Sequence, residues 1–255
     1  MDLFQIFLLI GAGTLGGAAN AIAGGGTFFS FPALLAAGVP PVMANATNSF
    51  AIWPGNAIAL FSYRDELGKH RTSLPWLLSA GLLGGGLGGW LLVQSSDRSF
   101  MSLVPVLMLV ATAAFAFKSR MLAFIRYFLA HSHHSHRILT IVLTFLVGLY
   151  GGYFNAGLGI MLLAALSLGG IEDHHELNGM KNLVSVSVST FSVIILIISG
   201  VISWPHAWVT LLGAILGGYL GGRYARRISK SWLERIVIGM GSLLTVVYAI
   251  KVYSI

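Results

Sequence analysis

The sequence predicts an all-α membrane protein built from two related halves of opposite orientation. The chain of 255 residues is 56% hydrophobic and 9% charged, with a mean hydropathy of +0.84, whereas soluble domains carry about 25% charged residues. Several apolar runs reach the length of about 20 residues that a bilayer crossing needs. The same order of segments also occurs twice, with basic residues in different loops of the two copies.

The first half opens with an apolar stretch, residues 3–39, that is too long for one span and is interrupted at Gly24–Gly26. Backbone groups need partners in lipid, so an interrupted helix persists only inside protein or beside water. We therefore expect a broken or re-entrant helical hairpin. The first residues lack the basic segment of a cleaved signal, which indicates a retained helix. Three spans are then expected, at residues 44–63, 74–93 and 100–117.

A basic stretch, residues 118–137, follows the first half and contains the histidine run His131–His136. Its amphipathic part, residues 121–129, is of the kind that lies along a membrane surface. The chain is thus divided into a first transmembrane repeat, residues 1–117, a basic cytoplasmic linker, residues 118–137, and a second transmembrane repeat, residues 138–255.

The second half repeats the order of the first. The apolar stretch 138–171 is broken at Gly157 and Gly159, and spans are expected at 177–199, 206–222 and 236–253. Two glycine blocks recur: GGxxN at residues 16–20 returns 135 residues later, and the block at residues 84–89 returns 133 residues later. Such self-similarity indicates an internal duplication.

Equivalent loops of the two halves carry opposite charge bias. The loop 64–71 has three basic residues and its counterpart near 200–206 has none, whereas the turn 95–99 has one and its counterpart 223–235 has five. Because cytoplasmic loops are enriched in Lys and Arg, the halves are expected to face opposite sides of the membrane, with both termini outside. Inverted halves with broken helices are typical of secondary transporters.

The segment GGAANAIAGGGTFFSFPALLAAGVPPVMANATNS, with its weaker repeats GGYFNAGLGIM and LNGMKN, resembles the sulfite exporter TauE/SafE family. The resemblance covers nearly the whole chain. It implies a multi-pass permease of the cytoplasmic membrane that moves small anions, typically sulfite or organosulfonates, without ATP hydrolysis by this chain. One departure is the pair Ile160-Met161, which stands where the first half has Gly25-Gly26, so the second break is expected to be less open.

An anion that enters a membrane protein must exchange its water for hydrogen-bond donors, and broken helices supply free amides at a positive helix end. Lys181 is a cation near the start of an otherwise uncharged span, where a charge is costly and by default functional. We expect it to balance the substrate charge; the alternatives are that it reaches the inner surface or pairs with Glu172, Asp173 or Glu176. The candidate substrate-binding residues are Asn20, Gly24, Gly25, Thr27, Asn45, Thr47, Asn48, Ser49, Asn155, Gly159, Lys181 and Asn182.

Other functions are weighed against this one. A divalent-cation transporter using the histidines lacks the intramembrane carboxylates that hard cations require, and an anion channel needs the same site chemistry as a carrier. An intramembrane serine hydrolase needs Ser and His on facing spans, but every His lies in a loop or at a span edge. We expect no enzyme activity, metal site or cofactor, and as partners a small anion and the bilayer, not nucleic acid. Homo-oligomer formation is compatible with these features.

Overall fold

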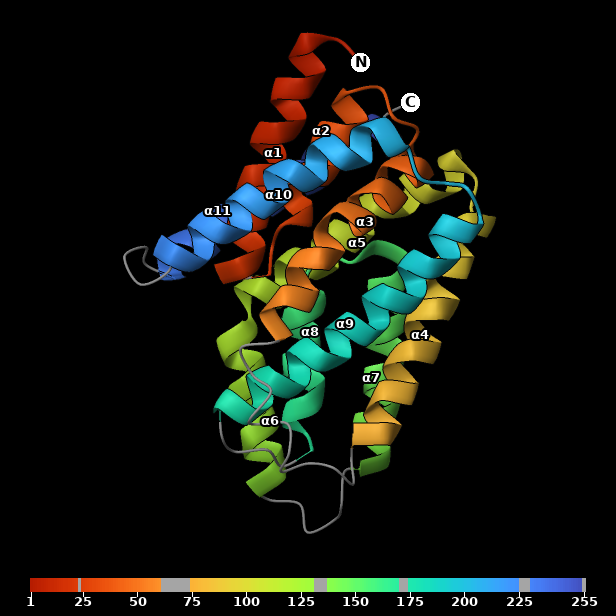
Figure 1. The fold of residues 1–255 in the computed structure, drawn as a ribbon. Helices are drawn as coiled ribbons and strands as arrows, with labels where there is room; N and C mark the ends of the chain where they lie inside the picture. Colours follow the sequence, from red (N-terminus) through yellow and green to blue (C-terminus); the bar gives the residue numbers. More distant parts are fainter. Residues whose placement is uncertain (23, 61–73, 131–136, 170–173, 225–229, 254–255) are drawn as a thin grey trace.

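The computed structural model describes residues 1–22, 24–60, 74–130, 137–169, 174–224 and 230–253, and these residues form helices and short connections without a strand (Figure 1). The first half contains α1 (Leu3–Ile22), α2 (Thr27–Ala36), α3 (Pro41–Leu60), α4 (Leu74–Gln94) and α5 (Asp97–Ala116). Next comes α6 (Lys118–Ala130), and the second half contains α7 (Arg137–Phe154), α8 (Leu158–Ser167), α9 (His174–Ile198), α10 (Trp204–Tyr224) and α11 (Lys230–Tyr253).

The chain is a multi-pass membrane protein. In the described ranges, six helices are long and apolar enough to cross a bilayer, namely α1, α4, α5, α7, α9 and α11. The short apolar helices α2 and α8 follow α1 and α7 after a break, so both predicted interruptions are confirmed. The two halves therefore share one order of elements: a long helix, a short helix and three further long helices.

Two expected boundaries are wrong. The linker 118–137 was expected to be a loop with a surface helix, but its first thirteen residues form α6, whose Ile125 packs on Ala164 of α8 and on Leu168 just after α8. The last span was expected to begin at residue 236, but α11 begins at Lys230 and contains Glu234. The apolar face of α6 explains the first difference, because Ile125 is buried against α8. The loop 64–71 lies outside the described residues.

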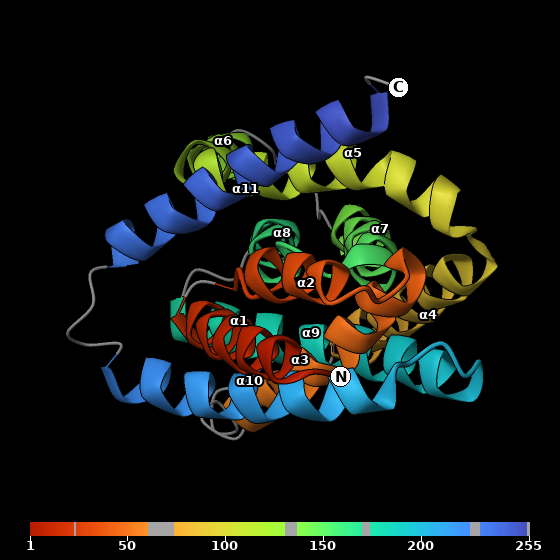
Figure 2. The ribbon, with the colours of Figure 1, turned by 90° about the horizontal axis from the view of Figure 1, so that it is seen from above.

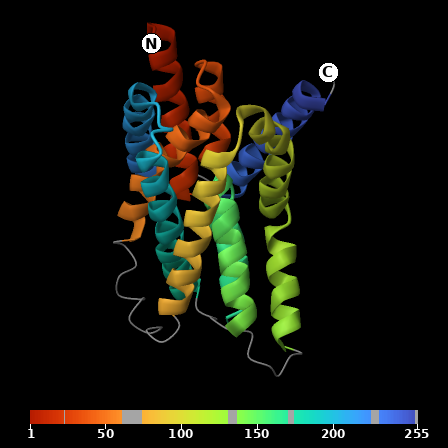
Figure 3. The ribbon, with the colours of Figure 1, turned by 90° about the vertical axis from the view of Figure 1, so that its right-hand side faces the viewer.

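The helices of the two halves pair crosswise. Helix α1 packs along α10, and its counterpart α7 packs along α4; helices α3 and α9 contact each other, as do α5 and α11. Figure 2 shows α5 and α11 along one side of the molecule, α10 along the other, and α2 and α8 between them. In Figure 3 both termini lie at one end, and α1 runs away from that end while α7 runs towards it. The orientation of the halves in a bilayer stays a prediction.

Glycines form the crossings of α1 with α10 and of α7 with α4. A β-carbon at Gly217 would collide with the carbonyl oxygen of Thr14, and one at Gly88 would collide with that of Leu149. Thr14 and Leu149 are 135 residues apart, so Gly217 is the structural counterpart of Gly88, not of Gly84. The expected offset of 133 for this block is wrong by one helical turn, because the contacts repeat at an offset of 129.

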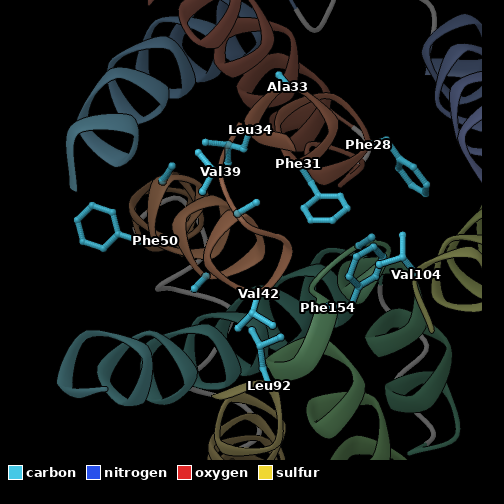
Figure 4. Packing of buried hydrophobic residues seen from close by; sticks show 14 of the residues in the cluster. Phe28, Phe31, Ala33, Leu34, Val39, Val42, Phe50, Leu92, Val104 and Phe154 are labelled. Carbon is cyan, nitrogen blue, oxygen red and sulfur yellow. The ribbon is translucent and has the colours of Figure 1, made fainter. Parts of the chain in front are cut away.

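The largest buried cluster includes residues beside both breaks, and Figure 4 shows part of it. Phe31 of α2 and Phe154, the last residue of α7, are fully buried, and their ring centroids lie 5.7 Å apart with the rings nearly perpendicular. Phe100 of α5 packs edge-on against Phe31 at 6.1 Å. Such edge-to-face pairs add to the stabilisation from burial. This aromatic core joins the short helix of the first half to the second break.

Candidate functional site

The first break is closed by hydrogen bonds between α2 and α3. Asn48 is fully buried, its Nδ2 donates to the Thr27 hydroxyl oxygen at 3.2 Å, and its Oδ1 accepts from the Ser30 hydroxyl. That hydroxyl also lies 3.1 Å from the carbonyl oxygen of Gly26. A buried amide is stable only when its donors and acceptors find partners. Asn48 and Thr27 therefore hold the start of α2 against α3.

Asn45 and Thr47 connect the two halves. The Nδ2 of Asn45 donates to the carbonyl oxygen of Tyr153 at 2.7 Å, near the end of α7. Its Oδ1 is buried and has no hydrogen-bond partner in the part of the chain that the structure describes. The hydroxyl of Thr47 accepts from the amide of Ser203 at 3.0 Å, just before α10. Ser49 is buried in the same helix. Asn45 and Thr47 bond to protein, so each has a structural partner already.

The other candidates of the first half line the break itself. Gly24 has a φ of +84°, and its amide donates to the carbonyl oxygens of Ala19 and Asn20, which ends α1. A β-carbon at Gly25 would lie 2.8 Å from Cγ1 of Val237 in α11. One at Gly26 would lie 3.1 Å from Cβ of Asn20, so Asn20 adjoins the break as expected. The space beside Gly25 is therefore filled by protein.

The second break is shorter and ends α7 with a left-handed residue. Asn155 has a φ of +53° and its amide donates to Gly151 at 2.9 Å; Gly157 follows with a φ of +74°. Asn and Gly tolerate this conformation best, so both residues fit their backbone positions. The amides of Ile160 and Met161 donate to Gly157 at 3.1 Å. The amide of Gly159 donates to no acceptor among the described residues, as is usual in a first helical turn.

Lys181 of α9 lies beside that free amide. Its side chain is half-buried, and its Cδ lies 3.9 Å from the place of a β-carbon at Gly159. Within the described ranges, Lys181 makes no hydrogen bond or ion pair, and the expected alternative of a pair with Glu176 is not found. Glu172 and Asp173 lie outside those ranges. Asn182, also half-buried, follows Lys181. A lysine side chain and a positive helix N-terminus are thus neighbours, and the described residues supply no counter-charge to the lysine.

The two groups of candidates lie at different levels of the molecule. The indole Nε1 of Trp53 donates to the hydroxyl oxygen of Thr190 at 2.8 Å, where α3 crosses α9. The two helices run in opposite directions (Figure 1). Asn48 precedes Trp53 by five residues and Lys181 precedes Thr190 by nine. At about 1.5 Å per residue, Asn48 and Lys181 are on the order of 20 Å apart, so the structure does not bring all candidates around one point.

An ion pair near the second break was not expected from the sequence. The Nζ of Lys118, at the start of α6, lies 2.9 Å from Oε1 of Glu234 in α11. Both residues lie in stretches that were expected to be basic loops, 118–137 and 223–235. The feature of the sequence that could have indicated this ion pair is Glu234, the one acidic residue in the basic stretch 223–235.

No group of three metal-ligating side chains occurs in the described part of the chain. The histidine run His131–His136 lies outside it, so the structure does not place these histidines.

Comparison with known proteins decides the family. The family model described as sulfite exporter TauE/SafE matches residues 9–248. The chain belongs to the sulfite exporter TauE/SafE family. It is 28% identical over 251 residues to a probable membrane transporter protein of Haemophilus influenzae, covering 96% of this chain and 94% of that protein. It is also 30% identical over 166 residues to the probable membrane transporter protein ORF9 of a Sinorhizobium species, covering 64% and 61% respectively. No solved structure matches the chain.

Proposed function

We propose that this protein is a secondary transporter that carries small sulfur-containing anions, such as sulfite or organosulfonates, across the cytoplasmic membrane. Family membership and the two relatives make it a membrane transporter. The observation that supports an anionic substrate is the half-buried Lys181 beside the free amide of Gly159 at the start of α8.

The chemistry of this place favours an anion. A lysine in a membrane span is costly without a counter-charge, and the N-terminus of a helix carries about half a positive charge. An oxyanion with several acceptor oxygens satisfies the ammonium and the amide together. We therefore assign substrate contact to Lys181, Gly159 and Asn182, and we assign to Asn155 the shaping of the break.

The first break also supports a substrate site at the second break, because the first break itself is filled by protein. Asn48 and Thr27 bond to each other, and Val237 fills the space at Gly25. We propose that the first break is a scaffold and that the second break holds the substrate while inverted halves expose it alternately.

Two other functions make different predictions. A divalent-cation transporter would need several ligating oxygens or imidazoles at one point. A channel would conduct the same anion without exchange. Preloading vesicles with unlabelled anion accelerates labelled uptake through a carrier and does not do so through a channel.

The decisive experiment measures anion uptake into liposomes that contain the purified protein. Sulfite, thiosulfate, sulfate, sulfoacetate and taurine are compared, with the wild type, Lys181→Gln and Lys251→Gln. Lys251 is exposed at the end of α11, so its variant controls for the loss of one positive charge. We expect Lys181→Gln to lower uptake more than tenfold, the size of effect that an intramembrane counter-charge supports. Equal uptake by the two variants would remove the proposed site.

A further inference from the structure

Lys118 lies level with the middle of α8. Before Lys118 in the chain, Ala111 of α5 lies 3.3 Å from the place of a β-carbon at Gly157, the residue before α8. After Lys118, Ile125 of α6 packs against Ala164 and Leu168 near the end of α8. Lys118 is seven residues from Ala111 and seven from Ile125. The segment from α5 into α6 therefore follows α8, and Lys118 stands level with the middle of α8, within about one helical turn of Gly159.

Two lysines and one glutamate thus lie along the first half of α8. Lys181 approaches from α9 at the level of Gly159 and has no partner among the described residues, and Lys118 stands within about one helical turn of that level along α8. Glu234 reaches Lys118 from α11 at 2.9 Å. Lys118 and Glu234 are 35% and 29% exposed, so water and small ions have access to the pair. Such partly exposed pairs contribute little to stability, so exchange of one partner costs little.

We infer that Glu234 is an internal anion that occupies Lys118 until a doubly charged oxyanion replaces it. This inference rests on the proposed function and names its substrate class. Lys181 and the N-terminus of α8 balance the charge of a singly charged anion, so such an anion does not displace Glu234 from Lys118. A dianion bridges both ammonium groups, because its second charge offsets the loss of Glu234 at Lys118.

The exchange also separates two elements. The ion pair joins the start of α6 to α11, which packs against α5. When the dianion holds Lys118, the Glu234 carboxylate is released to water and α11 loses its polar contact with α6. Substrate binding is thereby coupled to a change in the α5–α11 layer shown in Figure 2.

Neutral variants of the two residues test this inference, because it predicts that they change the half-saturating concentration of a dianion in opposite directions. Uptake of thiosulfate, a dianion, and of methanesulfonate, a monoanion, is measured in liposomes with Lys118→Gln, Glu234→Gln and the double variant. Glu234→Gln frees Lys118 and is expected to lower the half-saturating concentration of thiosulfate about tenfold, while Lys118→Gln raises it by a similar factor. The double variant should behave as Lys118→Gln does, and the values for methanesulfonate should stay within about twofold.

Several outcomes would overturn the inference. A half-saturating concentration that rises in both single variants, together with equal losses of melting temperature, would make the pair a structural ion pair only. Unchanged thiosulfate uptake in Glu234→Gln, with uptake abolished by Lys181→Gln, would remove the inference and leave the proposed function intact. Wild-type protein that moves none of the anions would remove both. Lys251→Gln again controls for a simple change of net charge.

Discussion

The two breaks have the same place in their halves, but their surroundings differ. At the first break, Asn48, Thr27 and Ser30 bond to one another, and Val237 fills the space at Gly25. At the second, Lys181 of α9 faces the start of α8, with its Cδ 3.9 Å from the place of a β-carbon at Gly159. A duplicated element has thus become a packed joint in one half, and in the other it leaves a cation and a helix end unpaired among the described residues.

The largest expected contrast comes from adding the same side chain at both breaks. Gly25→Val should destabilise the protein by about 1–3 kcal/mol, because Val237 already occupies that space. Gly159→Val should leave the melting temperature within a degree or two and raise the half-saturating anion concentration about tenfold, because it fills the space beside Lys181. Thermal unfolding in detergent and uptake in liposomes measure the two effects. A similar stability loss in both variants would mean that the second break is as closed as the first.

Asn48→Ala comes next in size. It leaves Thr27 and Ser30 without their partner in a buried place, which should cost about 1–3 kcal/mol. Asn182→Ala is the matched control, since Asn182 is half-buried and makes no recorded hydrogen bond to the described residues. Its melting temperature should stay near that of the wild type. Equal melting temperatures for the two variants would show that the network does not stabilise the first break.

Asn155 distinguishes a backbone role from ligand contact. Asn155→Ala replaces a residue type that tolerates the left-handed conformation with one that tolerates it less well, and should cost about 1 kcal/mol. Asn155→Gly keeps the backbone conformation and removes the amide side chain. We expect the glycine variant to retain both its melting temperature and most of its anion uptake. Loss of uptake in Asn155→Gly with normal stability would instead make the side chain a substrate contact.

The smallest effect is expected at the histidine run. Removal of His131–His136 should leave anion uptake within about twofold of the wild type, because an oxyanion needs donors and not metal ligands. A large loss, restored by added divalent metal ions, would favour the cation-transporter alternative.

Much of the fold follows from composition and glycine positions. The breaks were placed correctly because Gly24–Gly26 and Gly157 interrupt runs that are too long for one span. The duplication of GGxxN was in the correct register, as the matching contacts of Gly17 with Ala214 and of Gly152 with Gly85 show. The second glycine block was misaligned by one turn, because glycines four residues apart on one helix face look alike in sequence and only the partner backbone distinguishes them.

The candidate site was predictable in part. Lys181 stood out because it is a charge in an apolar segment, and the structure places it beside Gly159 as expected. Asn48 and Thr27 matched the same polar pattern, but sequence alone does not show that they bond to each other across two helices. Lys118 and Glu234 were hidden for a related reason: a basic stretch predicts a loop, whereas burial of Ile125 against α8 keeps the segment helical.

The glycine crossings carry a mechanical consequence. Backbone meets backbone where Gly217 touches Thr14 and Gly88 touches Leu149, with no side chain between them to change rotamer. Interfaces of this kind resist sliding, since a shift of one residue would drive a side chain into the opposite main chain. We therefore expect α1 to move together with α10, and α7 with α4, in the proposed transport cycle. Rearrangement is left to the joints between those two blocks, where α3 crosses α9 and α5 crosses α11.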